Sequence, residues 1–241
     1  MYLLSPPATQ AKMSKSSGID NYLPYVMHLA PSTLSGYNTC PLAGLCKDSC
    51  LNTAGRGRFN NVQLARIART KMFFEQRDEF FTMLKKEIDR ALRRCDKQGK
   101  KLSLRLNGTS DIRWEMYKPY DGKTIFEAYP QVQFYDYTKL PNRDVDGIAN
   151  YHLTFSDGGD NMDHVELALS RRMNVAVVFA GKILPEVWYG RKVIDGDKHD
   201  LRFLDPKGVI VGLTAKGKAK VDASNFVKDP GIANSQLKEA A

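Results

Sequence analysis

Three of the four cysteines in this 241-residue chain lie close together, in the segment Cys40-Pro-Leu-Ala-Gly-Leu-Cys46-Lys-Asp-Ser-Cys50. Thiolates this near in sequence can converge on one point, because Pro41 and Gly44 allow the loop to turn. In a reducing compartment, clustered thiols favour a metal over a disulfide. Cys40, Cys46 and Cys50 are therefore the candidate metal ligands.

The spacing of these cysteines favours an iron–sulfur cluster over zinc. Structural zinc sites commonly use a short C-x2-4-C knuckle, and the C-x5-C-x3-C pattern lacks both that knuckle and an adjacent histidine. A wider loop can wrap a 4Fe-4S cluster, with one thiolate on each of three irons and the fourth iron open. The spacing matches neither common ferredoxin pattern, so three ordinary buried cysteines remain the alternative.

The composition indicates one globular domain. Its excess of basic residues indicates either an acidic partner or a solvated basic surface. The chain is 42% hydrophobic and carries a formal net charge of +9, which attracts nucleic acid over long range. No apolar run approaches membrane-spanning length, and the N-terminus lacks the features of a signal peptide. We therefore expect no membrane association and a cytoplasmic location.

Alternating strands and helices predict an α/β fold. Residues 1–22 read as an N-terminal arm and 217–241 as a polar C-terminal tail, on either side of a core at 23–216. Crossover connections between strands require a mainly parallel sheet, which we expect to form a partial (β/α)6 TIM-like barrel. The apolar runs that predict its strands are 25–30, 102–107, 131–136, 151–156, 175–180 and 208–214.

Polar side chains follow most of these strands. The carboxyl ends of parallel strands meet on one face of such a fold, so the polar groups are expected to encircle the cysteine loop as a cofactor or substrate pocket. The ordinary alternatives are helix caps, turn residues and surface lysines. The candidate cofactor-binding residues are Asn107, Ser110, Asp111, Lys139, Ser156, Asp157 and Lys216.

A second group of candidates is basic. Arginines follow the cysteine loop and continue onto one face of a long helical region at 60–95, opposite its apolar face. In an alternative function, this basic helical face contacts nucleic acid or a host protein. The candidate nucleic-acid contacts are Arg56, Arg58, Arg66 and Arg69.

Several short motifs are spread over most of the chain. They are Leu3-Leu-Ser-Pro-Pro-Ala-Thr, Ser35-Gly-Tyr-Asn-Thr-Cys-Pro, Cys50-Leu-Asn-Thr-Ala-Gly-Arg-Gly, Arg105-Leu-Asn-Gly-Thr-Ser-Asp-Ile, Tyr135-Asp-Tyr-Thr-Lys, Val193-Ile-Asp-Gly-Asp and Asp200-Leu-Arg-Phe-Leu-Asp-Pro. With these motifs the chain resembles the tailed-bacteriophage family catalogued as gene product eighty-eight. That resemblance implies a viral protein located in the host cytoplasm, and it implies no particular reaction.

The cysteine loop after the first core strand also resembles that of radical S-adenosylmethionine enzymes. This resemblance implies a 4Fe-4S cluster whose open iron binds S-adenosylmethionine, on a partial (β/α)6 barrel. The usual loop in that family is C-x3-C-x2-C, and this chain departs from it. The leading hypothesis is a phage iron–sulfur protein related to radical enzymes, and the alternative is a non-enzymatic cluster protein that binds nucleic acid or a host protein.

Overall fold

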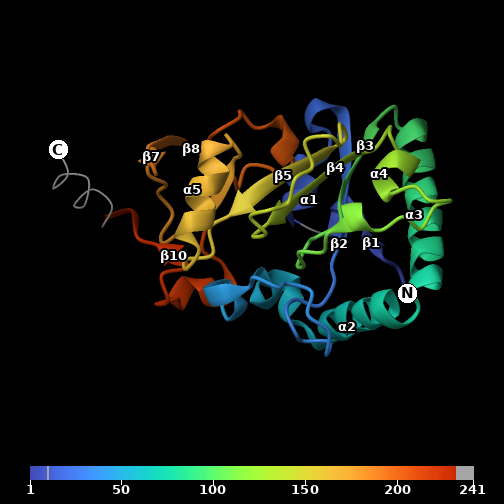
Figure 1. Cartoon of the computed structure of the whole chain (residues 1–241), viewed down its shortest axis with the longest axis horizontal. Coiled ribbons are helices and arrows are strands. Elements are labelled where there is room, and N and C mark those ends of the chain that lie inside the picture. Colours follow the sequence, from blue (N-terminus) through green and yellow to red (C-terminus); the bar gives the residue numbers. More distant parts are fainter. Residues whose placement is uncertain (10, 232–241) are drawn as a thin grey trace.

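The computed structural model describes residues 1–9 and 11–231. These residues form a mixed α/β protein around a 10-stranded sheet in the order β1-β2-β3-β4-β5-β6-β9-β8-β7, with β10 paired to β6 (Figure 1). The strands from β2 through β8 along this path are parallel, and the two edge strands are antiparallel to their neighbours. The strands are β1 (Leu4–Ser5), β2 (Tyr22–Met27), β3 (Lys101–Arg105), β4 (Gln133–Thr138), β5 (Tyr151–Ser156), β6 (Val175–Phe179), β7 (Val187–Trp188), β8 (Arg191–Asp195), β9 (Ile210–Thr214) and β10 (Val227–Lys228).

The sheet is open, so the predicted TIM-like barrel is wrong, whereas the predicted α/β fold with mainly parallel strands is confirmed. Closing a barrel requires the first and last strands to hydrogen-bond to each other. Here β1 and β7 are two-residue strands at opposite ends of the path, and within the described residues each pairs with one neighbour only. Short antiparallel strands thus end the sheet on both sides.

Three of the helices, α3, α4 and α5, pack on one face of the sheet. The longest helix, α3, buries Phe80, Leu84 and Ile88 against the leucines of β3, because apolar residues recur on one side of the helix. A smaller apolar cluster joins α5 to β6 and β9. The helices are α1 (Ala11–Ser16), α2 (Asn60–Glu75), α3 (Arg77–Lys97), α4 (Ile125–Ala128) and α5 (Met162–Ser170).

The opposite face of the central strands is polar. Side chains alternate between the faces of a strand, and Leu102 and Leu104 of β3 lie in the apolar core, so Ser103 and Arg105 lie on the other face. The same alternation in β4 and β5 assigns four more side chains to this polar face, namely Tyr135, Tyr137, His152 and Thr154.

The N-terminal segment covers part of the polar face. The Tyr135 hydroxyl lies 3.8 Å from the sulfur of Met13 in α1, and the Arg105 guanidinium pairs with Asp200 at 3.1 Å. Lys12 contacts the same carboxylate at 3.2 Å. One end of the polar face is therefore closed by α1 and the segment around Asp200.

Both predicted terminal segments contribute regular structure. The expected arm at 1–22 supplies β1 and α1, and the expected tail begins with a 3-10 helix, η8 (Gly217–Val221), and β10. The rest of the expected tail, 232–241, lies outside the described residues. Across the residues that are described, no helix is long and apolar enough to cross a membrane.

Candidate functional site

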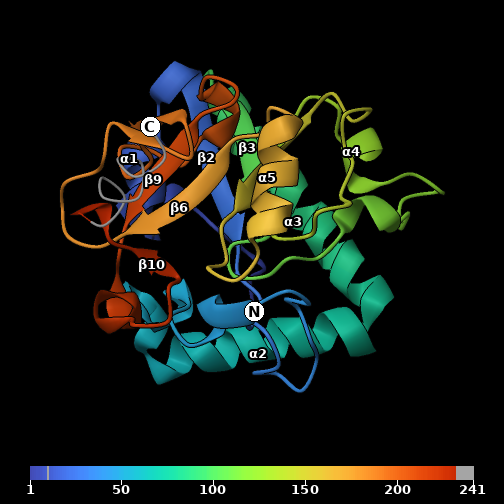
Figure 2. The ribbon, with the colours of Figure 1, turned by 60° about the vertical axis from the view of Figure 1, so that its left-hand side comes forward.

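The cysteine loop lies across the end of the sheet at which the parallel strands finish. Figures 1 and 2 both show the segment between β2 and α2 running along this end, with α2 beside it. The amide of Asp111, which follows β3, donates to the carbonyl of Thr39 at 2.8 Å. The Cys40 thiol donates to the carbonyl of Thr109 at 3.7 Å. The turn after β3 therefore holds the first cysteine in position.

The far side of the loop is held by two other segments. The Ser49 hydroxyl donates to the carboxylate of Asp222, and the amide of Lys218 in η8 donates to the Thr53 hydroxyl at 3.3 Å. Gly44 packs against Asp160, and a Cβ on this glycine would lie 2.5 Å from a carboxylate oxygen. The loop is thus fixed by residues far from it in sequence.

The three thiols of the loop share one neighbourhood. Cys40, Cys46 and Cys50 are all free and partly buried. Burial raises the pKa of the Cys50 thiol, and negative charge on Cys46 and Cys40 raises this pKa further. Burial likewise raises the pKa of the Cys40 thiol. Its hydrogen bonds and the nearby Lys139 ammonium lower this pKa, but burial outweighs them. The three sulfurs therefore lie within electrostatic range of a single cation.

That cation, Lys139, follows β4 and is partly buried. Burial lowers the pKa of Lys139, but Cys46 and the Asp111 carboxylate outweigh burial and hold the pKa above its ordinary value. A protonated lysine among thiols stabilises the thiolate form, which is the form that binds metals.

The thiols do not form a site for a single ion. In residues 1–9 and 11–231, no group of three or more His, Cys, Asp or Glu side chains is arranged to hold a metal ion. One zinc ion requires all its thiolates at about 2.3 Å, whereas a cluster takes thiolates on separate irons, which lie farther apart.

The predicted polar residues after β3 divide into two kinds. Asn107 and Ser110 are buried, and the Asn107 side-chain oxygen accepts from the Ser110 hydroxyl at 2.9 Å and from Trp114 Nε1 at 3.1 Å. These groups hold the turn together. Asp111 lies next to the thiols, where its carboxylate accepts from the amide of Lys139 at 2.8 Å and from Arg143 at 3.2 Å.

The predicted residues of the later strands lie elsewhere at this end of the sheet. Asp157 is buried and accepts from the amide of Gly159 at 2.7 Å and from the Tyr189 hydroxyl at 2.8 Å, and its carboxylate lies 3.6 Å from the Lys228 ammonium. Ser156 is partly buried at the end of β5. Lys216 is largely exposed and pairs with Asp197. Of the predicted cofactor-binding side chains, Asp111 and Lys139 are the two brought to the cysteines.

The four predicted nucleic-acid arginines do not share one environment. Arg56 and Arg58 are exposed on a 3-10 helix, η5 (Gly55–Arg58). Arg66 is only 5% exposed, donates to the side-chain oxygen of Asn52, and lies near Cys50. Arg69 donates to the carbonyls of residues 2 and 28. Arg66 thus belongs to the surroundings of the cysteine loop.

The sequence analysis did not single out His28 or the polar face of the sheet. Both ring nitrogens of His28 are buried and have no hydrogen-bond partner among the described residues. Alternation in the strand that ends at Met27 could have identified the residue, because Tyr25 and Met27 face the apolar core and His28 therefore faces away.

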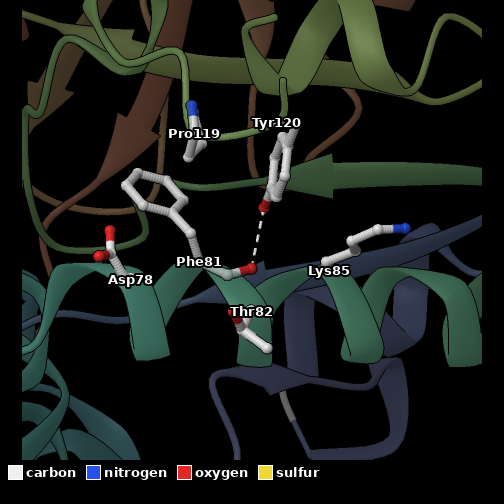
Figure 3. A pocket seen from close by; sticks show the side chains of 6 residues that line it. All are labelled: Asp78, Phe81, Thr82, Lys85, Pro119 and Tyr120. Carbon is white, nitrogen blue, oxygen red and sulfur yellow. Dashed lines mark hydrogen bonds between the residues drawn. The ribbon is translucent and has the colours of Figure 1, made fainter. Parts of the chain in front are cut away.

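The surface of the protein has two hollows. One, of about 260 Å³, lies between α3 and Pro119–Tyr120, where the Tyr120 hydroxyl donates to the carbonyl of Phe81 at 3.1 Å (Figure 3). The other, of about 360 Å³, lies at the start of α5. Neither hollow is lined by a cysteine.

The fold and this site define an α/β protein with an open, mainly parallel sheet and a cysteine loop over its strand ends. A family model described as Gene product 88 matches residues 3–230. The chain therefore belongs to the gene product 88 family, and its resemblance to that bacteriophage family is confirmed. No curated protein and no solved structure matches the chain, so the resemblance to radical S-adenosylmethionine enzymes gains no support from these comparisons.

Proposed function

We propose that this chain binds an iron–sulfur cluster through Cys40, Cys46 and Cys50. The observation that supports the proposal is that one loop supplies three free, partly buried thiols, with the Lys139 side chain within electrostatic range of them. The loop is held on both sides before any metal binds, so ordering it adds little to the cost of binding.

The charges around the thiols support the same proposal. Burial raises the pKa values of Cys40 and Cys50, so without a metal these thiols stay protonated at neutral pH. Metal binding displaces those protons. The resulting negative charge would be compensated by Lys139 and by Arg66, which lies near Cys50. A buried anionic centre without such cations would be costly.

When bound through three thiolates, a 4Fe-4S cluster supplies one-electron chemistry and an open iron. Lys139 would place a positive charge near the thiolates, and Asp111 would keep the backbone of Lys139 in place through its hydrogen bond. The finer form of the proposal, a divergent radical enzyme, adds S-adenosylmethionine as the ligand of the open iron.

Anaerobic reconstitution with ferrous iron and sulfide tests the proposal. We expect the wild-type protein to gain visible absorbance and bound sulfide, and the Cys40→Ser, Cys46→Ser and Cys50→Ser variants to lose most of both. Cys95→Ala is the matched control, because Cys95 is a buried thiol at the end of α3. A wild-type protein that takes up zinc but no iron and sulfide would contradict the proposal.

Adding S-adenosylmethionine to the reduced, loaded protein separates the two forms of the proposal. A change in the paramagnetic resonance spectrum supports a ligand on the open iron and hence an enzyme. An unchanged spectrum supports a cluster that stabilises the loop, because a structural metal contributes folding free energy directly.

The alternative function, nucleic-acid or host-protein binding, is favoured by one specific observation. Arg56 and Arg58 are exposed directly after the cysteine loop, and α3 also carries exposed basic side chains. Exposed arginines can contact phosphates and release counterions. In this alternative the cluster holds the loop that presents these arginines.

A further inference from the structure

The outer side of α3 carries a row of basic side chains. Residues four, seven and eleven positions apart lie above one another on an α-helix, because each turn takes about 3.6 residues. The row faces away from Leu84 and Ile88, which pack on the sheet side of the helix, and Figure 1 shows α3 along the outside of the molecule. All members of the row are exposed, and we call them the α3 basic row: Lys86, Arg90, Arg93 and Lys97.

No acidic side chain of the described residues forms an ion pair with this row. Solvated helix faces commonly pair such cations with acids four residues away. Three carboxylates lie on the same half of α3, and two of them are engaged elsewhere. Glu87 is buried and accepts from two backbone amides near the N-terminus at 2.9 and 2.7 Å, and Asp89 pairs with Lys85 at 3.6 Å. The third, Asp96, lies about a quarter of a turn from the centre line of the row.

The helix dipole explains only one end of the row. Cations in the last turn of a helix stabilise it, and the effect falls off within that turn. The cations in the last turn of α3 are Arg94 and Lys97. Lys86 and Arg90 lie in the middle of the helix, where the dipole gives them no such role. A row of cations that continues through the middle of the helix therefore favours a partner of opposite charge.

An exposed aromatic ring restrains one member of the row. The Arg90 guanidinium lies 5.7 Å from the centre of the Tyr2 ring, which is 67% exposed. The backbone at Tyr2 is itself held, because its carbonyl accepts from Arg69 Nε at 2.7 Å and the next two amides donate to Glu87. Arg90 is thus kept beside the other cations of the row while it stays open to solvent.

The length of the row suits a regular line of phosphates. From Lys86 to Lys97 the helix rises by about 16 Å. One strand of a nucleic-acid duplex places a phosphate about every 3.4 Å along its axis, so the row spans about five phosphates. A row fixed on a rigid helix complements a duplex better than a single strand, because the duplex also holds its charges at fixed spacing.

We propose that the α3 basic row binds the sugar–phosphate backbone of a nucleic-acid duplex, which rests on the nucleic-acid alternative above and names the partner and the contact surface. The whole of α2 separates this surface from Arg56 and Arg58, which precede that helix. The row contains no cysteine, so its role does not depend on the proposed cluster. Contacts of this kind position a duplex and carry no sequence preference.

Fluorescence anisotropy with a labelled DNA duplex of mixed sequence tests the proposal on the full chain without added metal. We expect the logarithm of the wild-type affinity to fall linearly with the logarithm of the salt concentration. Lys86→Gln with Arg90→Gln should reduce the slope of that line by about two, because each phosphate contact contributes about 0.9 to it. Glutamine is a good helix former, so α3 is expected to keep its structure.

Two further variants serve as controls. Lys182→Gln with Arg191→Gln also removes one lysine and one arginine, both exposed, near the β8 and β7 edge of the sheet, far from β3 where α3 packs. This pair should leave the slope unchanged. Exchanging the two cations, Lys86→Arg with Arg90→Lys, keeps the charge of the row and should keep the wild-type slope.

Three results would overturn the proposal. They are an equal change of slope in the Lys182 and Arg191 pair, a reduced slope after the exchange of the two cations, and tighter binding of a single strand than of a duplex of the same length. A slope that falls in Arg56→Gln with Arg58→Gln, but not in Lys86→Gln with Arg90→Gln, would refute the α3 basic row and leave the nucleic-acid alternative standing. A wild-type protein that binds no duplex would refute both.

Discussion

Replacing Asp200 with asparagine tests how far the stability of this fold depends on one buried carboxylate. The Asp200 side chain is fully buried and lies 3.1 Å from Arg105 and 3.2 Å from Lys12. Removing one partner of a buried ion pair costs about 3–5 kcal/mol, because the other charge stays buried without compensation. In Asp200→Asn the buried charge of Arg105 loses its partner, and this accounts for most of the expected loss of stability.

The exposure of the two partners sets the expected size of the effect. Lys12 keeps 27% of its side chain exposed and can return to water, whereas Arg105 keeps only 13%. We therefore expect the lower end of the range, a loss of about 3 kcal/mol in the free energy of unfolding. Urea unfolding at pH 7 measures this loss, and Asp146→Asn, at an exposed position, is the control.

The difference in the free energy of unfolding between wild type and Asp200→Asn should depend on pH, in a direction set by the pKa of Asp200. Burial raises the pKa of Asp200, but Arg105 and Lys12 outweigh burial and hold the pKa well below its ordinary value. A depressed folded-state pKa adds stability above the unfolded pKa, about 3.9, and that stability is lost as the pH falls through the folded pKa. The gap between wild type and Asp200→Asn should therefore be full at pH 7 and shrink below about pH 4.

Two outcomes would refute this reasoning. A loss no larger than that of Asp146→Asn would show that the ion pair adds nothing beyond its solvation cost. A gap that stays constant from pH 7 to pH 3 would show that the loss comes from shape or hydrogen bonding rather than from the charge of Asp200.

The other predictions concern the cysteine loop. Lys139→Met should lower the reduction potential of the loaded protein, because it removes a positive charge near the thiolates and so destabilises the reduced, more negative cluster. Protein-film voltammetry measures the shift. Gly44→Ala should reduce the iron content, because the glycine has a φ of +49° and a Cβ would press on Asp160. Arg56→Gln with Arg58→Gln should weaken duplex binding and reduce its salt dependence, as measured by fluorescence anisotropy over a range of ionic strengths.

Each of these predictions has a control in the same chain. Lys216→Met removes a more exposed lysine and should leave the potential unchanged. Gly55→Ala imposes a similar backbone cost at φ +52° with no atom within 4 Å of the added Cβ, so an equal loss of iron would contradict the role of Asp160. Lys182 and Arg191 are both exposed. Replacing these two with glutamine should reduce DNA affinity less than replacing Arg56 and Arg58 does.

The sequence alone predicted the parallel strands well, because their periodicity and turn residues are local signals. Strand 151–156 has the predicted limits, and five others differ only at their ends. The predicted closure of the sheet into a barrel was wrong. Closure depends on pairing between the two ends of the sheet, and no local sequence pattern indicates that pairing. The apolar runs also did not include β8, which pairs with β7 and β9.

The candidate site was only partly visible in the sequence. The position of Lys139 beside the thiols followed from its place after a parallel strand. By contrast, Lys216 pairs with Asp197, and Cys95 is buried although a charged helix end surrounds it in sequence. The position of Arg66 depends on how α2 packs under the loop, so spacing along the chain could not separate it from the exposed Arg58.

The most direct test of the central claim is the iron and acid-labile sulfide content of the anaerobically reconstituted protein, beside that of Cys46→Ser. The proposed cluster predicts equal amounts of iron and sulfide bound to the wild type, and a loss of most of both in the variant. Equal iron and sulfide in the two proteins, or iron without sulfide in the wild type, would contradict a cluster held by Cys40, Cys46 and Cys50.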